Sequence, residues 1–111
     1  MLLWTKSGGD VENREPGPGT TDEDAQLAAR ASSGDQRAFE KLIRKYERMI
    51  YRTAFYTAGN TEDAADLTQE IFLKLWHGLP DFRGNSRFLT WLIRIARNTC
   101  ADYVRKKQRT L

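Results

Sequence analysis

The sequence predicts an all-α fold, a compact bundle of three to four helices with a disordered N-terminal tail. Apolar residues recur at three- and four-residue spacings through three long segments, as on one face of an amphipathic helix. Glycine, asparagine and proline separate those segments, where helices commonly end. With 111 residues, 40% of them hydrophobic and 30% charged, the chain suits one globular domain with a single core.

The first half of the chain holds the tail and two predicted helices. Residues 1–20 are rich in glycine and proline, so we expect them to be disordered. A first helix is expected from Thr21, whose hydroxyl can cap the acidic turn after it, to about Ser33. Asp35 is the expected cap of a second helix that runs to about Ala58. The apolar stripe of this second helix consists of Phe39, Leu42, Ile43, Tyr46, Met49, Ile50 and Ala54.

The outer side of the second helix is basic. Its members are Lys41, Arg44, Lys45, Arg48 and Arg52. Such a row is either a solvated surface, with Glu40 and Glu47 nearby, or a secondary contact for a nucleic acid or a partner protein. The sequence leaves both interpretations open.

A third helix is predicted over residues 62–77. Gly59 suits a left-handed helix end, and Asn60 or Thr61 can cap the turn that follows. The side expected to face the core carries Ala64, Leu67, Ile71, Phe72 and Leu75, with Trp76 at its edge.

The other side of the third helix is mainly acidic. It carries Asp63, Asp66, Gln69, Glu70, His77 and, among them, Leu73. A lone leucine is ordinary on a protein surface. Beside Gln69 and Trp76, however, Leu73 could equally anchor a partner helix with basic residues.

A short loop and a last helix complete the predicted bundle. Pro80 ends the third helix, because proline cannot continue it. Residues 81–86 form the loop, in which Gly84 supplies flexibility and Asn85 or Ser86 can cap the last helix. That helix is expected to extend to about Arg105. We assign residues 21–107 to the domain and residues 108–111 to the start of a linker.

The last helix has two distinct faces at about 100° per residue. The core face carries Phe88, Leu92, Ile95, Ala96, Thr99 and Tyr103, flanked by Leu89, Ile93, Cys100 and Val104. The opposite side, here called the basic face, carries Arg87, Trp91, Arg94, Arg97, Asn98 and Arg105. These residue types neutralise phosphates, stack on an unpaired base and hydrogen-bond base edges. The basic face is therefore a candidate nucleic-acid contact.

Charge is segregated along the chain. The formal charge is −4 for residues 1–40, +1 for 41–80 and +6 for 81–111. This asymmetry suggests a polyanion at the C-terminal end, although a basic surface without a partner would give the same numbers. No apolar run approaches the roughly 20 residues that span a bilayer, so we expect a cytoplasmic location and no membrane contact. Cys100 has no second cysteine to pair with and is expected to be a buried, inert thiol.

Catalysis and metal binding have little support in the sequence. Asp66 and Glu70 could share a divalent cation, but one helix offers only that pair. His77 is the only histidine and has no cysteine at zinc spacing. There is no glycine-rich phosphate loop and no nucleophile elbow. We expect a binding protein that is not an enzyme and has no metal or cofactor.

Two long motifs, in order, resemble a known family. Residues 66–76 (DLTQEIFLKLW) are followed by 82–84 (FRG) and 88–98 (FLTWLIRIARN). Together they resemble the second conserved region of bacterial RNA polymerase sigma factors of the extracytoplasmic-function (ECF) class. Residues 34–35 and 38–40 also fit that class, so the resemblance covers about residues 22–107.

The resemblance implies an all-helical domain that docks on the clamp helices of the largest catalytic subunit of core RNA polymerase and reads the promoter −10 element. An anti-sigma protein as regulator is implied as well. By position, the polymerase-facing residues would be Asp66, Gln69, Glu70 and Leu73, with Trp76 at their edge. A base flipped from the non-template strand would enter a pocket in the loop of Phe82, Arg83, Gly84, Asn85 and Ser86. The strand would then run along Arg87, Trp91, Arg94 and Asn98, with Arg105 on the same face.

The chain departs from the family pattern in two respects. Housekeeping sigma factors have two adjacent tryptophans where this chain has Trp91-Leu92, which implies weaker melting of DNA and stricter promoter demands. The second domain of the class, which reads the −35 element, has no counterpart here. The sequence thus favours promoter recognition and local melting. The alternative is a helical protein–protein interaction module without sequence-specific DNA binding.

Overall fold

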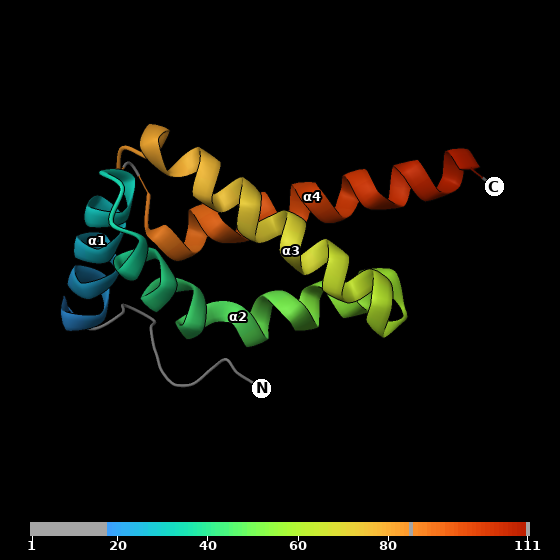
Figure 1. The fold of residues 1–111 in the computed structure, drawn as a ribbon, viewed down its shortest axis with the longest axis horizontal. Coiled ribbons are helices and arrows are strands. Elements are labelled where there is room, and N and C mark those ends of the chain that lie inside the picture. The colour runs from blue at the N-terminus through green and yellow to red at the C-terminus, as the bar shows by residue number, and fades with distance from the viewer. Residues whose placement is uncertain (1–17, 85, 111) are drawn as a thin grey trace.

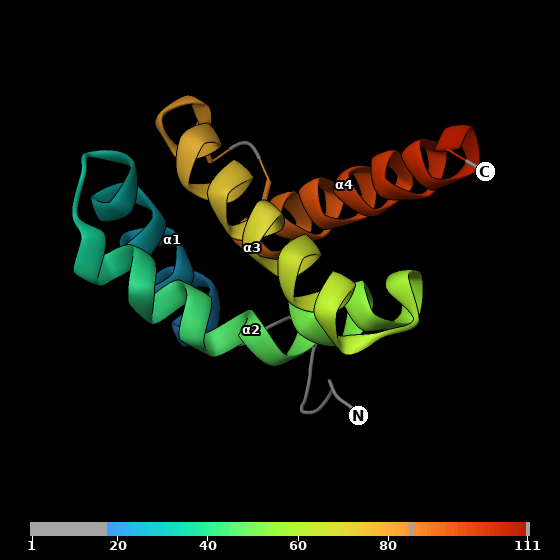
Figure 2. The ribbon, with the colours of Figure 1, turned by 45° about the vertical axis from the view of Figure 1, so that its right-hand side comes forward.

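The computed structural model describes residues 18–84 and 86–110, and within them it contains helices and no strands. The elements are α1 (Pro18–Ser32), α2 (Gln36–Ala58), α3 (Thr61–Gly78), the short 3-10 helix η1 (Leu79–Asp81) and α4 (Phe88–Thr110). In Figures 1 and 2, α1 lies across one end of the bundle, and the C-terminal end of α4 extends past the other helices. The predicted all-α bundle is confirmed.

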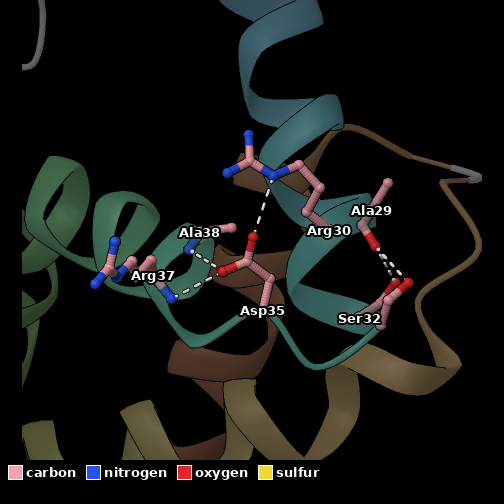
Figure 3. A network of polar contacts seen from close by, with 7 residues as sticks. Ala29, Arg30, Ser32, Asp35, Arg37 and Ala38 are labelled. Atoms are coloured by element: carbon pink, nitrogen blue, oxygen red, sulfur yellow. Dashed lines mark hydrogen bonds and ion pairs between the residues drawn. The ribbon is translucent and has the colours of Figure 1, made fainter.

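Asp35 joins α1 to α2, as Figure 3 shows. One carboxylate oxygen accepts hydrogen bonds from the backbone N–H groups of Arg37 (3.1 Å) and Ala38 (3.2 Å), which caps α2 as predicted. The other oxygen pairs with Nε of Arg30 near the end of α1, at 3.2 Å. The backbone hydrogen bond from Ala38 and the contacts with Arg30 hold the pKa of Asp35 below its usual value.

The turn between α2 and α3 also has the helix end and the helix cap that the sequence predicts. Gly59 ends α2 with a φ of 83°, a left-handed conformation that glycine adopts readily. Asn60 then caps α3 by accepting a hydrogen bond from the backbone N–H of Asp63 at 2.8 Å. Both predictions from the sequence are confirmed.

The core lies where all four helices meet. Its largest fully buried side chains are Leu42, Ile50, Leu67, Ile71, Leu75, Leu79, Leu92 and Thr99. All but Leu79, in η1, belong to the predicted apolar faces. Cys100 is buried, as expected.

The polar contact between α1 and α2 was not expected from the sequence. Asp24, on α1, is only 6% exposed. Its carboxylate accepts hydrogen bonds from Oη of Tyr46 and from Nζ of Lys45 at 2.7 Å, both on α2. Because a buried carboxylate is costly without partners, this contact fixes α1 against α2.

We expect Tyr46→Phe to lower the free energy of unfolding by about 1–2 kcal/mol at neutral pH, because buried Asp24 loses a donor. Burial and the hydrogen bond to Asp24 raise the pKa of Tyr46 above its ordinary value of 10.0. Above pH 10 the native protein thus keeps the Tyr46 hydroxyl proton, whereas the unfolded chain releases it. The free energy of unfolding of the wild type therefore exceeds that of Tyr46→Phe by the full amount below pH 10. Above pH 10 this difference shrinks by about 1.4 kcal/mol per pH unit.

Urea unfolding over this pH range measures the difference. Tyr56→Phe, at a side chain that is 84% exposed, is the control and should change nothing. A Tyr46→Phe deficit that stays constant as the pH rises would contradict the assignment.

The helix ends differ from the sequence prediction at both termini of the domain. α1 begins at Pro18, three residues before Thr21, while residues 1–17 of the predicted tail lie outside the described residues. α4 continues to Thr110 and does not stop at Arg105. The hydroxyl of Tyr103 donates to Asp63 of α3 at 2.7 Å, which holds the second half of α4 against the bundle. The domain boundary at residue 107 stays a prediction.

Candidate nucleic-acid interface and docking face

The basic face of α4 is open to solvent over most of its length. The exposed members are Arg94, Arg97, Asn98 and Arg105, together with Arg87, which precedes the helix. The backbone carbonyl of Arg87 accepts the first hydrogen bond of α4, from the N–H of Trp91 at 3.1 Å. Four arginines and one amide thus lie between residues 87 and 105, as the periodicity predicted.

Trp91 is the exception, and its predicted exposure is wrong. The indole is partly buried and packs against Phe82 and Phe88, with ring centroids 4.9 and 5.8 Å away. Phe82 and Phe88 also meet edge to face, at 6.2 Å. These three rings, here called the aromatic cluster, stabilise one another through burial and ring geometry. Only part of the indole therefore remains for a ligand.

The loop between η1 and α4 starts from the aromatic cluster. Phe82 points partly inward, whereas Arg83 and Gly84 are exposed and Ser86 is half-buried. Gly84 has a φ of 75°, which favours glycine at that position. The hydroxyl of Ser86 donates to the Arg87 carbonyl at 3.4 Å. The predicted site residue Asn85 lies outside the described residues.

The outer face of α3 combines acidic side chains with one apolar residue. Asp66 and Gln69 are exposed, Glu70 is half-buried, and Leu73 is 51% exposed in spite of its apolar side chain. Trp76 lies at the edge, half-buried, with its ring centroid 5.0 Å from that of Phe39 on α2. The structure therefore brings the predicted docking residues together. We call this surface the docking face.

A groove between α2 and α3 reaches Phe72, the neighbour of Leu73 in the chain, and was not predicted from the sequence. It has a volume of about 530 Å³ and is lined by Glu47, Arg48, Tyr51, Arg52, Phe55, Thr68 and Phe72. Tyr51 and Phe55, one helical turn apart, stack with centroids 6.3 Å apart and are 39% and 40% exposed. An aromatic pair at four-residue spacing outside the apolar stripe was the available signal.

A chain of ion pairs links the docking face to the basic face. Lys74 lies 3.7 Å from Glu70 and 3.7 Å from Asp102 on α4, and Asp102 also pairs with Arg105. All four side chains are substantially exposed, so each pair contributes little to stability. Arg105 thus reaches solvent with a carboxylate beside it, unlike the simple free cation that the periodicity suggested.

The structure also bears on the basic row of α2 and on the possibilities of a metal site and a membrane span. Lys45 belongs to the contact with Asp24 and lies 3.8 Å from Glu23, so it is not a free member of the basic row on α2. Over the described part of the chain, no group of three His, Cys, Asp or Glu residues could hold a metal ion. Nor does any described helix have the length and hydropathy to cross a membrane.

Residues 42–110 match the model of the family described as Sigma-70 region 2. The ECF RNA polymerase sigma factor SigW of Bacillus subtilis is 39% identical over 75 residues, which are 68% of this chain and 40% of that protein. The chain thus spans less than half the length of such curated relatives.

Two solved structures resemble the fold as well as the sequence. An engineered region 2 of sigmaE in complex with GTAAAA, solved by NMR, gives a TM-score of 0.72 at 35% identity, over 79% of this chain and 92% of that one. CnrH in complex with the cytosolic domain of CnrY gives 0.68 at 37% identity, over 73% and 53%. The chain belongs to the Sigma-70 region 2 family and is a region 2 domain of the ECF class of RNA polymerase sigma factors.

Proposed function

We propose that this domain recognises the promoter −10 element as an unpaired strand while it docks on core RNA polymerase. The loop of residues 82–86 and the basic face of α4 bind the DNA, and the docking face of α3 binds the polymerase. The role is one of binding and positioning, without catalysis. The observation that carries the proposal is the row of exposed arginines on α4, which ends at the aromatic cluster and its open loop.

The DNA contact divides into two kinds of interaction. Exposed arginines spaced along one helix face suit the phosphates of a strand, and such contacts do not distinguish sequences. The loop offers Arg83 and backbone groups around Gly84, next to rings on which a base can stack. Taking a base out of the duplex costs a few kcal/mol of unstacking, which stacking and hydrogen bonds in the loop offset. Sequence would therefore be read mainly in the loop.

The docking face suits a partner helix that carries basic residues. Leu73 supplies an apolar anchor, and the carboxylates of Asp66 and Glu70 flank it. The adjoining groove adds aromatic surface from Tyr51 and Phe55, which interfaces use often. We assign this combined surface to the clamp helices of the largest catalytic subunit.

Two neighbours in structure support the choice of partners. An engineered region 2 of sigmaE binds GTAAAA, and by analogy this domain binds a short unpaired strand. CnrH binds the cytosolic domain of CnrY. By the same analogy, a regulatory anti-sigma protein holds this domain away from the polymerase.

Fluorescence anisotropy with labelled single-stranded hexamers, GTAAAA among them, tests the proposal at two salt concentrations, with and without core polymerase. We expect the affinities of different sequences to differ by roughly tenfold, since one mismatched position typically costs about 1–3 kcal/mol. Equal affinity for all sequences, even with polymerase present, would leave only the protein-interaction role.

We expect Arg94→Ala to weaken binding of every oligonucleotide alike, because we assign its exposed guanidinium to a phosphate and not to a base. The slope of log affinity against log salt should decrease by about 0.7, the contribution of one contact to a single strand. Arg37→Ala removes the same charge from an exposed position on α2 outside the basic row and serves as the control. A change of sequence preference in Arg94→Ala would show that this side chain contacts a base.

A further inference from the structure

Gly78, the last residue of α3, has no backbone reason to be glycine. Its φ of −85° and ψ of −14° lie in the right-handed helical region, which every L-residue adopts. Glycine is less favourable than alanine in a helix, because it loses more conformational freedom on folding. Some feature outside the backbone of Gly78 must therefore account for the missing side chain.

The indole of Trp91 occupies the space where a side chain would begin. A Cβ atom placed on Gly78 would lie 3.1 Å from Cζ2 and 3.6 Å from Cη2 of Trp91. The first distance is tighter than carbon atoms normally pack, so the ring would have to move by a few tenths of an ångström. The indole edge is thus seated directly on the bare backbone at the end of α3.

The remaining contacts of Trp91 leave it little room to adjust. Phe82 lies 4.9 Å away and Phe88 5.8 Å away between ring centroids. Phe82 follows η1 directly, and η1 follows Gly78. A ring pushed off Gly78 must therefore displace the start of the loop or swing further into solvent.

We propose that Gly78 is a positioning residue for DNA recognition: the absence of its side chain seats Trp91, and the seated indole sets where a base of the bound strand stacks. This inference rests on the proposed function. It also makes the end of α3, the helix with the docking face, one wall of the base site. Phe82 and α4 supply the other walls.

Gly78→Ala in the whole chain tests the proposal. We expect the indole N–H resonance of Trp91 to shift, as assigned with Trp91→Phe. Affinity for the preferred oligonucleotide should fall about 3- to 10-fold, part of what one stacked base contributes. The salt dependence should stay unchanged, because the phosphate contacts remain.

A double-mutant cycle with Trp91→Phe distinguishes the contact between Gly78 and Trp91 from a general effect of Gly78→Ala on the stability of α3. In the Trp91→Phe background the smaller ring removes the close contact, so Gly78→Ala should raise the melting temperature, as a better helix former does. In the wild-type background it should leave the melting temperature unchanged or lower it.

Two results would overturn the inference. One is an unmoved Trp91 resonance together with a raised melting temperature in the wild-type background. The other is the same loss of stability in both backgrounds. If the wild type bound no oligonucleotide at all, the proposed function would fail, while the resonance and the stability cycle would still decide whether Gly78 seats Trp91.

Discussion

Leu73→Glu is expected to abolish binding of the domain to core RNA polymerase without changing its helical content. The side chain is 51% exposed, so a carboxylate there remains hydrated in the free domain. In the complex the same carboxylate would be desolvated, among the carboxylates that already flank it. The cost of an unpaired charge in an interface is about 3 kcal/mol or more, which corresponds to a loss of affinity above roughly 100-fold. Binding to immobilised core polymerase and far-ultraviolet circular dichroism measure the two expectations.

Val104→Glu is the matched control for this experiment. Val104 is also an apolar residue on a helix surface, 39% exposed, but it belongs to α4 and is not one of the docking-face residues. Its replacement should leave polymerase binding unchanged. If Leu73→Glu bound normally, the docking face would be elsewhere, and a loss of helicity would mean that Leu73 supports the core.

Trp91→Ala is expected to have two separable effects. Loss of a stacking surface should weaken binding of the preferred oligonucleotide by about 1–3 kcal/mol. Loss of packing against Phe82 and Phe88 should lower the free energy of unfolding by about 1–3 kcal/mol, less than for a fully buried tryptophan. Anisotropy well below the melting temperature measures the first effect, and thermal unfolding measures the second.

Trp91→Leu distinguishes stacking from packing. Leucine restores part of the apolar contact with the aromatic cluster but offers no flat ring to a base. We expect stability to recover in part while oligonucleotide affinity stays low. If Trp91→Leu bound DNA as tightly as the wild type, Trp91 would act through the fold alone.

The helices were predictable because their signals are local. The spacing of Leu42, Ile50 and the other apolar residues of α2 places one face in the core whatever packs on it. Asp35 and Asn60 cap the turns that immediately follow them. Contacts between distant residues left no such signal. The hydrogen bond of Tyr46 to Asp24 spans 22 residues and that of Tyr103 to Asp63 spans 40, so neither the α1–α2 contact nor the extended α4 was foreseen.

The candidate site shows the same division. Rotation around one helix axis separated Arg94 and Asn98 correctly from the core residues. It placed Trp91 on the exposed side with Arg94 and Asn98, because a single-helix projection does not include Phe82 and Gly78, against which the indole packs. The groove beside the docking face needs two helices to exist, so the sequence of α2 alone could not outline it.

The hydrogen bond from Tyr103 to Asp63 removes one degree of freedom from α4. The helix is continuous from Phe88 to Thr110, so it turns about its axis as a unit or not at all. A turn by one residue step, about 100°, would carry the Tyr103 hydroxyl away from Asp63 and bring Leu92 toward solvent. In the proposed complex, the arginines would therefore meet every strand at the same angle. In the proposed complex, adaptation to different bases would then fall to the exposed Arg83 and Gly84 of the loop before α4.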